Sequence, residues 1–179
     1  MKKRIFRYIK HIVLTILVLG SIGILFGLFH GAGLHYGDNP LMMDWDKEGP
    51  YIFYKSDSML QVNYIKGNKD DGFYLEQKNY PIDSLISASC YFSLDSSSFD
   101  FSIKTDFETP MSTYNDNNKI LAISDIESGY KTFRDFLINS KVIDKNLNWT
   151  FGNGHLVLVG DFVDRGFSTT QVLWFIYKL

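Results

Sequence analysis

The feature that most constrains this chain is a run of 18 residues without a charged side chain, from Ile12 to Phe29. A helix of that length rises about 27 Å at roughly 1.5 Å per residue, close to the ~30 Å hydrocarbon core of a bilayer. Residues 1–11 carry five Lys and Arg side chains and no acid. Because such basic flanks stay in the cytoplasm, the sequence predicts one transmembrane signal anchor over residues 12–30. Residues 1–11 are then cytoplasmic, and the rest is periplasmic or extracellular.

A cleaved signal peptide is the alternative to this anchor. The apolar region of such a peptide usually runs about 7–15 residues and ends at a small-residue cleavage site. The small residues that follow here, Gly31-Ala32-Gly33, fit that site poorly. An uncleaved anchor is therefore favoured. Residues 31–50 are rich in Gly, Pro, Asp and Asn, which is typical of a tether to a folded domain.

The charge distribution argues against nucleic acid as a partner. The formal net charge is −2, but the chain beyond residue 10 has 13 Lys and Arg against 20 Asp and Glu, a balance of −7. Nucleic-acid phosphates demand a basic face, whereas an acidic body favours cations. The single cysteine, Cys90, cannot form a disulfide within the chain, so cysteine usage leaves the redox compartment open.

Residues 51–114 form a β-rich accessory segment by their pattern. Short aromatic and β-branched runs alternate with turn-forming residues, as is typical of antiparallel strands. The runs cover residues 51–54, 60–65, 73–75, 86–94 and 99–103. This segment is either a separate module or an extension of the domain that follows, and packing is the favoured role of its aromatic side chains.

Residues 119–179 change to a β-α-β-α pattern. The apolar runs 119–125 and 156–161 are typical of buried parallel strands. Apolar residues at helical spacing predict helices over about 129–141 and 169–179. This order is typical of a layered α/β domain, of which the chain carries the first half.

Acidic side chains follow both predicted strands, Asp125 and Glu127 after the first and Asp161 and Asp164 after the second. Ligands bind beyond the carboxyl ends of parallel strands, and carboxylates crowded there cannot all stay ionised without a cation. Their oxygens suit Mg²⁺ or Mn²⁺ better than soft metals, so the sequence predicts a metal site. Taken singly, each acid is as consistent with a helix cap or turn, and Asp164 with Arg165 as a surface ion pair.

Two blocks containing these residues resemble a known family. Residues 160–166, GDFVDRG, match the GDxxDRG block of calcineurin-like metallophosphoesterases, especially their phosphoprotein-phosphatase-like branch. Residues 124–128, SDIES, lie where the GDxHG block of that family belongs. The resemblance covers residues 119–179. It implies the first half of a metallophosphoesterase-type layered α/β domain, preceded by the transmembrane helix and the β-rich segment.

The resemblance also implies a role for each site residue. Asp125 would ligate one of two divalent metal ions, and Asp161 would bridge both. Arg165 would hold the substrate phosphate, and Asp164 would orient a catalytic histidine from outside the metal shell. The implied reaction is hydrolysis of a phosphate ester in a protein, a nucleotide or a small phosphomonoester. Glu127 stands where the family has a metal-binding histidine, and a carboxylate there favours Mn or Mg over Fe or Zn.

The family's Asn-His block and its later histidines have no counterpart before Leu179. His155 is not a substitute, because it precedes the second strand and lies at the opposite end from Asp161. The expectation is therefore the N-terminal portion of a membrane-anchored phosphoesterase. Two alternatives stay open: a catalytically inactive fragment or relative, and a membrane-tethered binding module in which residues 51–105 act.

Overall fold

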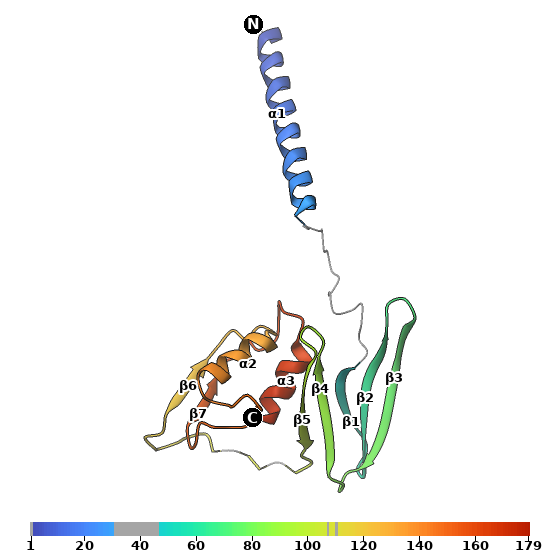
Figure 1. Cartoon of the computed structure of the whole chain (residues 1–179), viewed down its shortest axis with the longest axis vertical. Coiled ribbons are helices and arrows are strands. Elements are labelled where there is room, and N and C mark those ends of the chain that lie inside the picture. The colour runs from blue at the N-terminus through green and yellow to red at the C-terminus, as the bar shows by residue number, and fades with distance from the viewer. Residues whose placement is uncertain (1, 31–46, 107, 110) are drawn as a thin grey trace. The chain divides into compact units, whose positions relative to one another are not determined.

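The computed structural model of the chain describes residues 2–30, 47–106, 108–109 and 111–179. It contains two compact units, Met1–Asp38 and Asn39–Leu179. In the first unit, helix α1 (Lys2–Phe29) contains the predicted apolar run (Figure 1). By length and composition α1 is able to cross a membrane, with a mean hydropathy of 2.7 in its most apolar window. Most of the predicted tether, residues 31–46, lies outside the described residues.

The second unit begins with five antiparallel strands, one for each apolar run predicted between residues 51 and 103. They are β1 (Glu48–Ser56), β2 (Met59–Asn68), β3 (Gly72–Pro81), β4 (Ile86–Phe92) and β5 (Ser97–Ile103). The first three form one sheet in the order β1-β2-β3, and β4 pairs with β5 in a separate hairpin. Strand β1 starts at Glu48, so the last residues assigned to the tether belong to this sheet.

The remaining elements form a β-α-β-α unit, as predicted. They are β6 (Ile120–Ile123), α2 (Tyr130–Asn139), β7 (His155–Leu158) and α3 (Thr169–Lys178). Strands β6 and β7 pair in parallel, with Ile120 opposite His155. Parallel neighbours need a crossover connection, which α2 supplies here. Both strands therefore end at the same edge, where the acidic residues follow.

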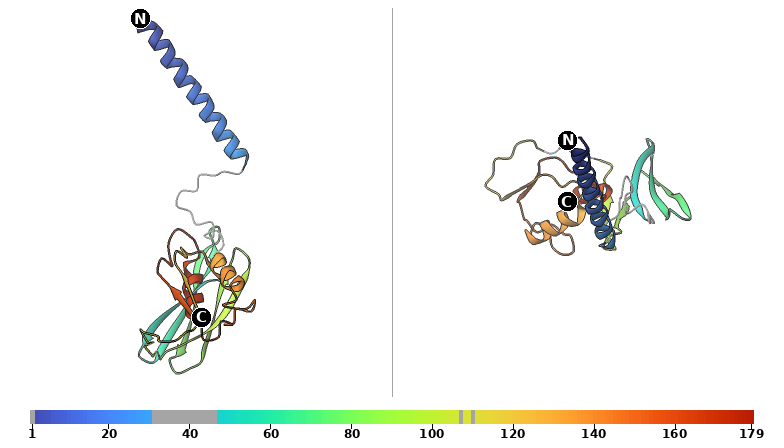
Figure 2. Two further views of the ribbon diagram at one scale, coloured as in Figure 1. Left: turned by 90° about the vertical axis from the view of Figure 1, so that its left-hand side faces the viewer. Right: turned by 90° about the horizontal axis from the view of Figure 1, so that it is seen from above.

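One hydrophobic core joins the β-rich segment to the α/β segment. Cys90 of β4 and Phe99 of β5 are buried together with Tyr130 and Phe133 of α2 and Phe175 of α3. The two helices lie between the β4–β5 hairpin and the β6–β7 pair (Figures 1 and 2). The ring centroid of Phe175 lies 5.4 Å from that of Phe99 and 5.4 Å from that of Tyr130. The β-rich segment is thus part of the same folded unit.

The prediction that both parallel strands are buried was wrong. Ile120 is 68% exposed and Val157 42% exposed, whereas Leu121 and Leu158 pack against the core. Successive side chains of a strand point to opposite faces. Because β6 and β7 form a two-stranded sheet covered on one face among the described residues, the other face remains exposed.

Candidate metal centre

Three acidic side chains meet at the carboxyl ends of β6 and β7. Asp125 and Glu127 come from the loop after β6, and Asp161 from the loop after β7. One carboxylate oxygen of each residue lies within 4.8 Å of those of the other two. Asp125 and Asp161 are exposed, and Glu127 is partly buried. The structure therefore places the three predicted metal ligands in one cluster, termed the acidic cluster below.

Backbone hydrogen bonds hold the two loops together. The Glu127 N–H donates to the carbonyl of Asp161 at 3.0 Å, and the Ser128 N–H donates to that of Phe162 at 2.8 Å. The Gly166 N–H donates in turn to the carbonyl of Glu127 at 3.0 Å. These main-chain hydrogen bonds therefore fix the positions of Glu127 and Asp161 relative to each other, whether or not a metal ion is bound.

Ser128 adds a side-chain contact between the same segments. It is 1% exposed, and its Oγ lies 2.8 Å from Oγ1 of Thr169 in the first turn of α3. The Ser168 N–H also donates to the Ser128 carbonyl at 3.2 Å. No spacing signal in the sequence pointed to this contact, because a single loop serine has no periodicity. Its position directly after a predicted ligand was the available clue.

Five non-glycine residues of these loops have left-handed backbone conformations. Their φ angles are 56° at Asp125, 50° at Glu127, 60° at Ser128, 52° at Asp161 and 50° at Arg165. Such conformations cost L-residues about 1–3 kcal/mol each and persist where the surroundings hold them. They cluster at ligand sites in general, which agrees with the convergence of carboxylates here.

Arg165 lies at the edge of the acidic cluster. Its Nη1 is 2.7 Å from Oε1 of Glu127, and its Nε is 3.7 Å from Oδ2 of Asp164. The Arg165 side chain is 71% exposed, and a guanidinium carries five N–H donors. It can therefore pair with Glu127 and still offer donors to an oxyanion. Asp164 makes no hydrogen bond to a histidine among the described residues.

The donor set and its charge fit a divalent cation. The three carboxylates bring a formal charge of −3, and the guanidinium paired with Glu127 returns +1, which leaves −2. Asp164, 3.7 Å from the same guanidinium, adds a further −1, so one divalent ion offsets most of the remaining charge. Carboxylate oxygens are the ligands that Mg²⁺ and Mn²⁺ prefer. These residues are thus chemically suited to hold such an ion.

Gly166→Ala is expected to disturb this arrangement. A Cβ at Gly166 would lie 2.9 Å from the carbonyl oxygen of Ser128 and closer still to that of Glu127. Because backbone atoms cannot move away cheaply, we expect a loss of about 1–3 kcal/mol in the free energy of unfolding and weaker Mn²⁺ binding. Urea unfolding and calorimetric titration measure the two effects.

Gly152→Ala is the matched control for that change. Gly152 lies in another loop, has a φ of 63°, and would have no atom within 4 Å of an added Cβ. Its replacement should cost some stability through backbone strain but leave Mn²⁺ affinity unchanged. Wild-type stability and wild-type Mn²⁺ affinity in Gly166→Ala would contradict the close approach of the loops.

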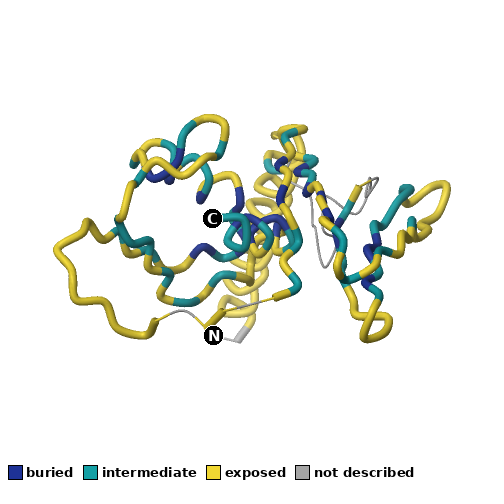
Figure 3. The backbone as a smooth tube through the Cα atoms, turned by 90° about the horizontal axis from the view of Figure 1, so that it is seen from below, coloured by how far each residue is buried: buried dark blue, intermediate teal, exposed yellow. Residues whose placement is uncertain are grey.

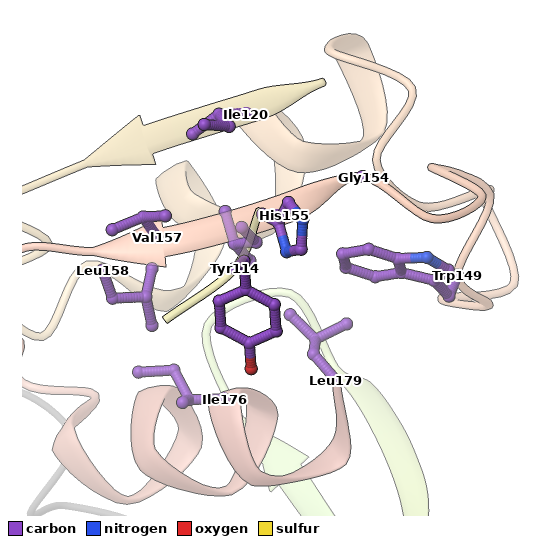
Figure 4. A pocket seen from close by; sticks show the side chains of 10 residues that line it. Tyr114, Ile120, Trp149, Gly154, His155, Val157, Leu158, Ile176 and Leu179 are labelled. Atoms are coloured by element: carbon purple, nitrogen blue, oxygen red, sulfur yellow. The ribbon is translucent and has the colours of Figure 1, made fainter. Parts of the chain in front are cut away.

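An apolar cavity of about 500 Å³ lies elsewhere, between the β6–β7 pair and α3. Figure 4 shows Tyr114 and His155 side by side in it, facing Ile176 and Leu179. His155 begins β7, and its Nε2 lies 2.9 Å from Oδ2 of Asp116. This histidine is at the opposite end of the strand from the acidic cluster, as predicted, and contributes nothing to that cluster.

Comparison with known proteins points to phosphatases. No family model matches the chain. Shewanella-like protein phosphatase 1 of Plasmodium berghei (strain Anka) is 40% identical over 63 residues, which are 35% of this chain and 17% of that protein. Shewanella-like protein phosphatase 2 of Arabidopsis thaliana is 32% identical over 85 residues, 48% of this chain and 20% of that protein. The chain thus matches a fifth or less of the length of these relatives.

The solved structures that match the chain are also of phosphatases. A cold-active protein tyrosine phosphatase determined at 1.1 Å matches with a TM-score of 0.56 and 27% identity, over 74% of this chain and 37% of that one. The cold-active protein-tyrosine phosphatase of a psychrophilic Shewanella species matches with a TM-score of 0.53 and 29% identity, over 74% and 38%. In sequence and in fold, the chain is therefore similar to part of known phosphatases.

Proposed function

We propose that this chain carries the metal-binding and phosphate-binding edge of a metal-dependent phosphatase of the calcineurin-like metallophosphoesterase type. The observation that carries the proposal is the convergence of Asp125, Glu127 and Asp161 beside the guanidinium of Arg165. This convergence lies at the carboxyl end of a parallel strand pair, the usual place for ligands in α/β sheets. The similarity to phosphatases in sequence and fold supports the same reaction class.

Each residue of the proposed site has a distinct role. The carboxylates of Asp125, Glu127 and Asp161 hold the cation, with Mn²⁺ or Mg²⁺ favoured over Fe or Zn because the donors are oxygens. A divalent ion at such a site supplies charge neutralisation for phosphate and a water of lowered pKa. Arg165 binds and orients the phosphate oxygens through its N–H donors. A second ion, which the family resemblance implies, would need ligands beyond these three carboxylates.

The substrate we propose is a phosphorylated protein. The relatives in both comparisons are protein phosphatases by name. The 71% exposure of Arg165 leaves its phosphate-binding side open to a large partner. Nucleotides and small phosphomonoesters have the same phosphate chemistry and serve as comparison substrates in the assays below.

The proposed location follows from α1. Its apolar length suits a membrane anchor, and the basic residues before Ile12 favour a cytoplasmic N-terminus. The unit that contains the acidic cluster then acts on the extracytoplasmic side. External protease should therefore digest residues 47–179 while the cytoplasmic membrane is still intact. Protection of these residues until that membrane is opened would contradict the proposed location.

A chelation experiment tests the proposed reaction. The purified full chain in detergent is stripped with EDTA and assayed for release of phosphate from a phosphopeptide and an aryl phosphate. Activity should be absent after stripping and return with Mn²⁺ or Mg²⁺. Activity that survives chelation would contradict metal dependence, and no activity with any divalent ion would favour the catalytically inactive alternative.

Arg165→Ala is expected to separate phosphate binding from metal binding. Loss of a charge-assisted contact worth about 1.5–3 kcal/mol should raise the inhibition constant for inorganic phosphate on the order of 10- to 100-fold. Mn²⁺ binding should be retained, since the guanidinium is not a ligand. Lys131→Ala removes a positive charge from the exposed pair with Asp135 on α2 and should change neither quantity. Loss of Mn²⁺ from Arg165→Ala would contradict its assigned role.

A further inference from the structure

Strand β3 presents an open edge. It ends the order β1-β2-β3, and its outer side pairs with no other strand among the described residues (Figure 1). The opposite edge strand, β1, is interrupted by register shifts and contains Pro50. In contrast, the register of β3 with β2 runs without a break from Pro81 to Gly72. An unbroken edge of this kind is a template for addition of another strand.

The side chains of β3 leave this edge accessible. Eight of its ten residues are exposed (Figure 3). Tyr74 is 63% exposed and Leu75 56% exposed, and as neighbours they lie on opposite faces of the sheet. Natural edges are commonly protected by bulges, by proline or by unpaired lysine. Here the proline, Pro81, stands at the very end, and Lys78 is 3.0 Å from Glu76.

The charges of β3 are complementary to those of a second copy of the same strand. Glu76 and Lys78 flank Gln77. In an antiparallel pair with its two-fold axis at Gln77, Glu76 of each copy faces Lys78 of the other. Registers centred on Glu76 or Lys78 instead place like charges opposite each other, which destabilises a strand pair. The pattern therefore favours one register.

We propose that β3 pairs with β3 of a second copy of this chain, antiparallel and with the two-fold axis at Gln77. The two three-stranded sheets then form one six-stranded sheet. In the folded unit β3 lies on the other side from β6 and β7, so pairing leaves both acidic clusters accessible (Figures 1 and 2). The proposal is independent of phosphatase activity.

Disulfide cross-linking of the full chain in detergent tests the register. In the proposed pair the Cβ atoms of residue 77 from the two copies lie about 4.5–5.5 Å apart, so Gln77→Cys should form a disulfide-linked dimer under mild oxidation. Residue 74 lies three positions from the axis, and its two copies are roughly 20 Å apart, so Tyr74→Cys should form no disulfide cross-link between the two copies. The native Cys90 gives little background, because it is fully buried and burial raises the pKa of its thiol. Equal cross-linking at positions 77 and 74 would overturn the register.

Charge reversal tests the same contact without added cysteines. Lys78→Glu places acid opposite acid and should weaken the dimer about tenfold or more in analytical ultracentrifugation. The double change Glu76→Lys with Lys78→Glu restores opposite charges across the axis and should restore the dimer. Circular dichroism verifies that each variant is folded. A monomeric wild type, an undiminished Lys78→Glu dimer, or a folded double variant that stays monomeric would each overturn the proposal.

Discussion

Asp161→Asn is expected to weaken Mn²⁺ binding by the chain about 100-fold or more. The change removes one of three carboxylates from the acidic cluster and lowers its formal charge from −2 to −1 once Arg165 is counted. Changes outside the ligand shell already cost about 10- to 100-fold in metal affinity, so loss of a ligand should cost at least as much. Calorimetric titration of the full chain with Mn²⁺ measures the effect, and metal-dependent phosphatase activity should fall in parallel.

The control for this change is Asp83→Asn. Asp83 is exposed in the turn between β3 and β4, outside the acidic cluster, so the same isosteric replacement alters the net charge equally. Mn²⁺ affinity should be unchanged in that variant. Equal Mn²⁺ affinity in Asp161→Asn and the wild type would contradict the role of Asp161 as a ligand.

Phe175→Ala is expected to lower the free energy of unfolding by about 3–5 kcal/mol, a large share of the roughly 5–15 kcal/mol typical of a domain. Its side chain is fully buried, and its ring contacts Phe99 of β5 as well as Tyr130 and Phe133 of α2. Truncation therefore removes packing between the β-rich segment and both helices. Urea unfolding of the full chain, followed by circular dichroism, measures the loss.

Leu173→Ala on the same helix is the control. Leu173 is 47% exposed, and its truncation should cost about 1 kcal/mol or less. Because the core is continuous, Phe175→Ala should shift one cooperative transition. Separate transitions, with only one of them moved, would show instead that the β-rich segment folds as a module of its own.

Local sequence patterns predicted the elements of this fold well. Turn residues such as Asp71-Gly72 marked the gaps between strands, and apolar spacing located α2 and α3. These signals act over a few residues, so they are readable without knowledge of the fold. The order β-α-β also placed Asp125 and Asp161 at one sheet edge, because parallel strands joined by a crossover end on the same side.

Contacts between distant segments were not predictable in the same way. Packing of Phe99 against α3 joins residues more than 70 positions apart, and no local pattern encodes it. The ion pair between Arg165 and Glu127 depends likewise on how the two loops fold against each other. The exposure of Val157 was mispredicted because a short apolar run has the same sequence pattern in two kinds of sheet. In a wide sheet both faces are covered, whereas the two-stranded sheet here is covered on one face among the described residues.

The most direct test of the proposed metal centre is anomalous X-ray scattering from crystals of the chain soaked with Mn²⁺. We expect an anomalous peak about 2.0–2.6 Å from carboxylate oxygens of Asp125, Glu127 and Asp161, with Arg165 beside it. The peak should be absent from Asp161→Asn crystals under the same conditions. Two results would contradict the assignment of these carboxylates as metal ligands. One is Mn²⁺ bound only at another place in the chain, and the other is an acidic cluster that holds no Mn²⁺ at saturating concentration and pairs only with Arg165.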